Sequence, residues 1–96
     1  MSYHCPEIDE ALMLETLRSV VSVPSPTGFT EAAAALVSEI AGSLGFEAET
    51  ESNGNVVVTV PGREDGPCTA VAAHIDTLGL MVRSVNADGT LNFSGI

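Results

Sequence analysis

The ten residues AHIDTLGLMV, at positions 73–82, decide the fold prediction for this chain of 96 residues. Residues 69–75 form an apolar run without polar alternation, which predicts a central strand buried on both faces. His74 and Asp76 stand two residues apart near the carboxyl end of that strand. Because side chains on a strand repeat their direction every two residues, the imidazole and the carboxylate can point at one metal ion.

Helical spacing of apolar residues precedes this run. It predicts a helix over residues 7–23, which ends before Pro24 and Pro26 because a proline disfavours helical geometry in the residue before it. A second helix follows, with Thr30 as its N-cap and Gly45 as its C-terminal cap.

Shorter segments on both sides of the apolar run are typical of strands and turns. Two hairpins are predicted, with strands at residues 46–51 and 56–60 and at residues 78–85 and 90–93. The order of helix, helix, hairpin, central strand and hairpin predicts an α/β sandwich whose sheet starts with an antiparallel pair.

The composition excludes several classes of function. Thirteen acidic residues stand against three arginines and no lysine, for a net charge of −10, so binding to nucleic acid phosphates or to an anionic membrane is not expected. Cys5 and Cys68 form no disulfide framework, and Cys68 is predicted to be a small core residue. No secretory signal or membrane-spanning run is visible, so a soluble cytoplasmic protein is expected.

Metal chemistry at His74 is a minority interpretation when spacing alone is considered, because a lone histidine is more often structural or surface-exposed. The end of a strand in an open α/β sheet favours a ligand site, Asp76 can orient the imidazole, and Gly79 allows close approach of another backbone. A catalytic zinc needs about three protein ligands, however. The other histidine, His4, is predicted to be solvated, and Ser25 is predicted to lie in a turn rather than to act as a nucleophile.

Three segments together resemble a known peptidase family: VPSPTGFTE at residues 23–31, NGNV at residues 53–56, and residues 73–82. They resemble the amino-terminal part of the dinuclear metallo-aminopeptidases, which include glutamyl, deblocking and tetrahedral aminopeptidases and were often misnamed cellulases or endoglucanases. The resemblance extends over residues 14–96. The first segment is shared with related exopeptidases, whereas the third, with Asp88-Gly89 behind it, is more specific.

The resemblance implies a fold and a domain organisation. The expected fold is the amino-terminal part of a three-layer zinc-exopeptidase-like α/β domain, with two helices and a mixed sheet. Residues 1–84 would belong to the catalytic peptidase domain, and residues 85–96 would hold the first strand of an inserted β-rich dimerisation domain.

The resemblance also implies roles for two residues. His74 matches a ligand of one of two divalent metal ions, zinc or cobalt, and Asp76 matches the catalytic carboxylate that assists it. In the family the ions polarise a peptide carbonyl and activate a bridging water, and the enzyme is a homo-oligomer built from dimers that acts on peptides. Because the other ligands and the glutamate base lie later in the family sequence, this chain is expected to be an inactive fragment that binds metal weakly at most. Thr77 departs from the commoner acidic residue, which leaves the substrate preference open.

Two alternatives remain at this point. One is another di-zinc exopeptidase or deacylase, of the carboxypeptidase-like or acetylornithine deacetylase-like kind, which also carries His-x-Asp near a strand end. The other is a non-enzymatic binding or assembly module that keeps the fold. Substrate choice separates the first from an aminopeptidase, and continuation of the reading frame into further metal ligands would exclude the second.

Overall fold

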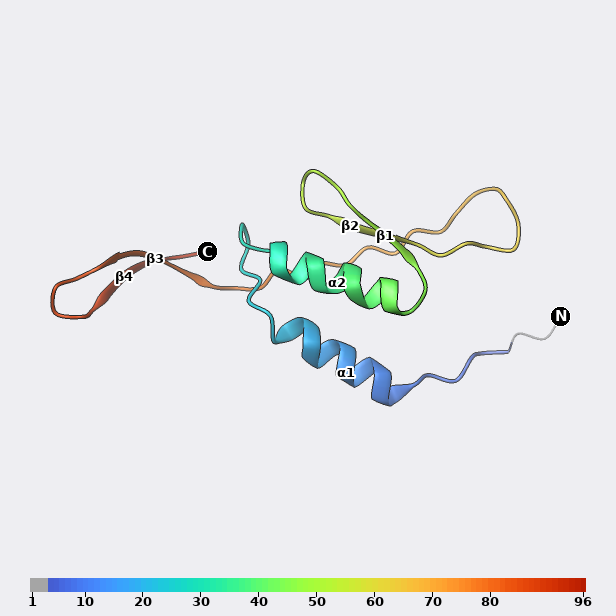
Figure 1. Cartoon of the computed structure of the whole chain (residues 1–96), viewed down its shortest axis with the longest axis horizontal. Coiled ribbons are helices and arrows are strands. Elements are labelled where there is room, and N and C mark those ends of the chain that lie inside the picture. The colour runs from blue at the N-terminus through green and yellow to red at the C-terminus, as the bar shows by residue number, and fades with distance from the viewer. Residues whose placement is uncertain (1–3) are drawn as a thin grey trace.

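The computed structural model describes residues 4–96, and it has an elongated shape with extents of 69 × 31 × 22 Å (Figure 1). Two helices and two β-hairpins follow one another along the chain, which confirms the predicted order of these elements. Their bounds are α1 Glu10–Val21, α2 Glu31–Ser43, β1 Glu47–Thr50, β2 Val56–Thr59, β3 Leu80–Val85 and β4 Leu91–Gly95.

Local sequence signals account for the start of α1 and for the end of α2. The Asp9 side chain accepts a hydrogen bond of 3.0 Å from the Leu12 amide, which caps the start of α1. Thr30 occupies the predicted N-cap position of α2, although its side chain makes no capping hydrogen bond. Gly45 follows α2 with φ of +87°, the left-handed conformation that suits the predicted glycine cap.

Helix α2 is the centre of the small core. It packs against α1 and against the β1–β2 hairpin, as Figure 1 shows. Among the described residues, the buried apolar side chains are three alanines of this helix: Ala33, Ala34 and Ala41. Helix α1 buries none of its residues, and its large apolar side chains Leu12, Met13, Leu14, Leu17 and Val21 are exposed.

The predicted central strand is absent from the structure. Residues 69–75 run as an extended segment without strand pairing, and Val71 is 93% exposed. The prediction that Cys68 is a core residue is also wrong, because its side chain is exposed. A strand buried on both faces needs partner strands along its edges and a layer over each face, and the described residues supply neither to this segment.

The described strands form two separate two-stranded antiparallel sheets rather than one mixed sheet. β1 pairs with β2 and β3 pairs with β4, both as hairpins. The architecture of these residues is therefore α/β at the level of its elements, with one parallel bridge, Pro26 to Thr77, outside the two sheets.

A shift in the pairing register of β3 determines which side chains share one face of the second hairpin. The pairing shifts between Val82 and Ser84, so that an extra residue, Arg83, interrupts the alternation. As a result Val82 lies opposite Phe93 and Val85 opposite Leu91 on one apolar face, and both phenylalanine and leucine are more than half exposed. The antiparallel pairing continues one step beyond the two strands, where the Ile96 amide donates to the Gly79 carbonyl at 3.0 Å.

Within residues 4–96, no helix has both the length and the apolar character required to cross a membrane.

Candidate functional site

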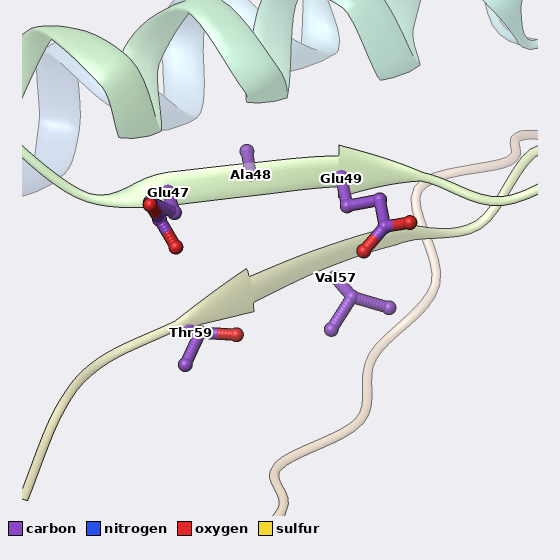
Figure 2. Close-up of a pocket in the computed structure, with 5 residues that line it drawn as sticks. All are labelled: Glu47, Ala48, Glu49, Val57 and Thr59. Carbon is purple, nitrogen blue, oxygen red and sulfur yellow. The ribbon is translucent and has the colours of Figure 1, made fainter.

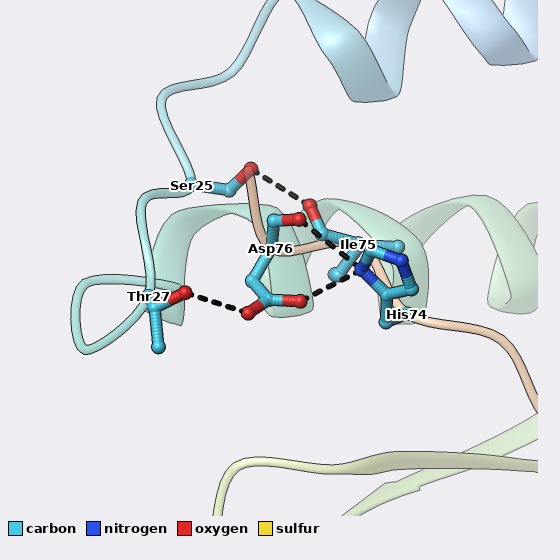
Figure 3. A network of polar contacts seen from close by, with 5 residues as sticks. All are labelled: Ser25, Thr27, His74, Ile75 and Asp76. Atoms are coloured by element: carbon cyan, nitrogen blue, oxygen red, sulfur yellow. Dashed lines mark hydrogen bonds and ion pairs between the residues drawn. The ribbon is translucent and has the colours of Figure 1, made fainter. Parts of the chain in front are cut away.

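The turn that follows α1, residues 24–28, lies against the segment that carries His74 and Asp76 (Figure 3). The Thr77 amide donates to the Ser25 carbonyl at 2.8 Å, and Pro26 and Thr77 form the parallel bridge. The Ser25 hydroxyl donates to the Ile75 carbonyl at 2.9 Å, and Ser25 is only 2% exposed. Ser25 thus lies in a turn, as predicted, and its hydroxyl anchors that turn to the segment.

Gly79 permits this close approach. A Cβ atom at Gly79 would lie 2.7 Å from the Cβ of Pro26, a distance that carbon atoms do not tolerate without movement. Gly79 was expected to allow close approach of another backbone, and the Cα of Pro26 would lie 3.8 Å from the added Cβ atom. The atom that comes nearest belongs to the proline ring rather than to the backbone.

His74 and Asp76 are hydrogen-bonded to each other, as expected of a carboxylate that orients the imidazole. The Nδ1 atom of His74 lies 2.8 Å from Oδ1 of Asp76 and 3.2 Å from the Asp76 carbonyl oxygen. An ionised carboxylate and a carbonyl only accept hydrogen bonds, so Nδ1 carries the hydrogen and donates it. In the neutral imidazole Nε2 then has the free lone pair, the form in which histidine binds metals. The His74 side chain is 86% exposed, so Nε2 is accessible.

A second hydrogen bond holds the other oxygen of Asp76. The Thr27 hydroxyl donates to Oδ2 at 2.7 Å, and Figure 3 shows the carboxylate lying between Thr27 and the imidazole. The pKa of Asp76 is lowered from its ordinary value of 3.8, mainly by the bond from Thr27 and next by the bond from His74. The carboxylate is therefore ionised at neutral pH.

This lowered pKa has a consequence that can be measured. A carboxyl group whose folded pKa is depressed adds stability above the unfolded pKa, and that stability is lost as the pH falls through the folded pKa. We expect the Asp76 contacts to be complete above pH 3.8 and to be lost progressively below it. Carbon NMR of the carboxyl group should give a titration midpoint below that of the same chain unfolded in urea. Equal midpoints would contradict the two hydrogen bonds.

The other candidate groups lie apart from this pair. Residues 4–96 contain no group of three or more histidine, cysteine or acidic side chains placed to hold a metal ion. His4 is exposed, as predicted for a solvated residue. Glu47 and Glu49 line a shallow hollow with Val57 and Thr59, on the face of the first hairpin directed away from α2 (Figure 2). These two glutamates belong to a solvated strand face and not to the His74 site.

Comparison with known proteins bears on the same segment. The family described as M42 glutamyl aminopeptidase matches residues 54–96, which include both members of the pair. A Bacillus subtilis (strain 168) protein named as aminopeptidase YhfE is 35% identical over 78 residues, which are 81% of this chain and 22% of that protein. The glutamyl aminopeptidase of Lactococcus lactis subsp. cremoris (strain MG1363) is 29% identical over 79 residues, again 81% of this chain and 22% of that protein.

Over residues 54–96 the chain matches the M42 aminopeptidase family. This match and the two similar aminopeptidases confirm the resemblance found in the sequence. The chain spans 22% of the length of the two curated relatives. Thr27 lies in the turn motif of the sequence, but the motif alone does not predict its hydrogen bond to Asp76.

Proposed function

We propose that this chain is part of a metal-dependent aminopeptidase that removes amino-terminal residues from peptides, with His74 as a ligand of one of two divalent ions, zinc or cobalt. Asp76 is the carboxylate that assists this ligand. The observation that carries the proposal is the bond between Nδ1 of His74 and Asp76, which leaves an exposed Nε2 inside the segment that matches the family.

The residues present can supply one of the protein ligands of such a site. Nε2 of His74 is a nitrogen ligand held in its metal-binding tautomer, and Asp76 already uses both carboxylate oxygens on Thr27 and His74. A catalytic zinc site takes about three protein ligands, so we place the others and the general base outside these residues. When bound, the two ions supply the Lewis acidity that polarises a peptide carbonyl and activates water.

Metal titration of the 96-residue chain tests the assignment of ligands. We expect zinc or cobalt to bind His74 weakly, without saturation at equimolar metal, because one imidazole leaves the coordination mostly to water. The His74→Ala variant should lose this binding, whereas His4→Ala should retain it. Tight one-to-one binding, measured by calorimetry, would contradict a site that is incomplete in these residues.

The reaction is tested on the longest polypeptide that the gene encodes. We expect it to hydrolyse aminoacyl-anilides, to lose that activity with a chelator, and to regain it with zinc or cobalt. Hydrolysis of N-acyl amino acids alone would favour the carboxypeptidase-like or deacylase alternative. Absence of any metal-dependent hydrolysis would favour a binding module. The 96-residue chain alone should be inactive on both sets of substrates.

The proposed domain organisation follows the family resemblance. We propose that residues 1–84 belong to the peptidase domain of a cytoplasmic enzyme and that residues 85–96 open an inserted dimerisation domain. The boundary falls at the last residue of β3, within the second hairpin. Removal of the insertion from the longer polypeptide should convert its homo-oligomer to monomers in sedimentation velocity, and an unchanged oligomer would overturn this division.

A further inference from the structure

We propose that Thr27 is a positioning residue that acts through Asp76 to keep His74 in its metal-binding tautomer. This inference rests on the proposed function, because it concerns the same imidazole. The side-chain hydrogen bond of Thr27 is to Asp76 and not to His74 itself. Its role is to hold the carboxylate that holds the histidine.

The contacts of the Asp76 carboxylate support this role. Oδ2 accepts from the Thr27 hydroxyl at 2.7 Å, and Oδ1 accepts from Nδ1 of His74 at 2.8 Å. Since the ionised carboxylate has no hydrogen of its own to donate, the hydrogen in each bond comes from the partner. Rotation of the carboxylate about its bond to the methylene group would break both bonds together. Thr27 therefore keeps Oδ1 directed at the imidazole.

Hydrogen bonds of Ser25 hold in place the turn that carries Thr27. Its neighbour Ser25 is buried and donates to the Ile75 carbonyl, and the Thr77 amide donates to the Ser25 carbonyl. These two bonds flank Asp76 on both sides along the chain. The turn and the pair thus form a continuous set of hydrogen bonds, in which Thr27 is the link to the carboxylate (Figure 3).

Loss of the Thr27 hydroxyl has a defined chemical consequence. The carboxylate can then turn away from Nδ1, and the neutral imidazole can place its hydrogen on Nε2 instead. That second tautomer has no lone pair on the exposed nitrogen and cannot bind a metal there. Because the contact is exposed, water competes for it, and the expected change is a roughly two- to fivefold drop in the ratio of the two tautomers.

The test is nitrogen NMR of the 96-residue chain labelled on its histidines, without metal, at mildly alkaline pH where imidazole is neutral. The wild-type chain is compared with Thr27→Val, which keeps the shape and lacks the donor, and with Thr27→Ser, which keeps the donor. His4, exposed and apart from the pair, is the internal reference. Exchange protection of the Thr77 amide reports on the turn independently, because that amide donates to Ser25.

The proposal expects His74 to favour the Nδ1–H tautomer in the wild-type chain and in Thr27→Ser, and to lose that preference in Thr27→Val with the Thr77 amide still protected. An unchanged tautomer ratio in Thr27→Val overturns it. Thr27→Ser behaving like Thr27→Val overturns it too, as does loss of Thr77 protection in Thr27→Val, since the residue would then only shape the turn. A tautomer ratio of His74 in the wild-type chain equal to that of His4 also overturns it. Because no metal or substrate is present, these outcomes are independent of the peptidase assay.

Discussion

Replacing His74 with alanine is expected to lower kcat/KM for an aminoacyl-anilide by more than about 100-fold in the longest polypeptide that the gene encodes, since loss of a supporting partner alone typically costs 10- to 100-fold. The reason is that Nε2 of His74 is the exposed lone pair that Asp76 orients. Metal analysis of the purified variant should show less bound zinc or cobalt than in the parent. The two measurements together connect the lost activity to a lost ligand.

Two further variants sharpen this result. Asp76→Asn keeps the size of the side chain but removes the charge that favours an Nδ1–H donor, so we expect a smaller loss, about 10- to 100-fold. His4→Ala should leave kcat/KM unchanged, because His4 lies outside the pair. Retention of normal activity and metal content by His74→Ala would remove the basis of the proposed function.

Replacing Gly79 with alanine is expected to detach the turn from the His74 segment. The new Cβ would lie 2.7 Å from the Cβ of Pro26, and Pro26 cannot rotate away as a flexible side chain could. We expect the turn to shift and to lose the bond between the Thr77 amide and the Ser25 carbonyl. Overpacking of this kind costs about 1–3 kcal/mol, here in the free energy of local opening.

Hydrogen exchange at the Thr77 amide measures this opening directly. The matched control is Gly42→Ala, because a Cβ at Gly42 meets nothing within 4 Å and the position lies in α2. That control should strengthen the helix by about 0.5–1 kcal/mol and leave Thr77 protection unchanged. If Gly79→Ala kept the protection of the parent chain, the close contact between Pro26 and Gly79 would not be needed to seat the turn.

The parts of the structure that could be predicted depend on residues near one another in sequence. Helix α2 follows from apolar spacing and from Gly45, and both hairpins follow from short alternating segments around turns. The pairing of His74 with Asp76 is equally local, because only two residues separate them.

The parts that could not be predicted depend on distant partners. Residues 69–75 are as apolar as a central strand requires, yet burial depends on what covers them, and the described residues do not cover Val71. The hydrogen bond from Thr27 to Asp76 likewise depends on a partner that is distant in sequence. A threonine in a turn after two prolines is adequately explained by the turn itself, and nothing in a single sequence indicates which carboxylate its hydroxyl meets.

The two side-chain bonds from the turn join residues 49 and 50 positions apart, Thr27 to Asp76 and Ser25 to Ile75. Closing a loop of that length has an entropic cost that must be met before its contacts can form. The helices and hairpins, whose contacts are local, can therefore form earlier than the support of the His74 site. The histidine and its aspartate are close in sequence, whereas the bonds from the turn to Ile75 and Asp76 require the intervening half of the chain to close. If Thr27 holds the proposed metal-binding tautomer, we expect that tautomer to form late, after the turn is complete.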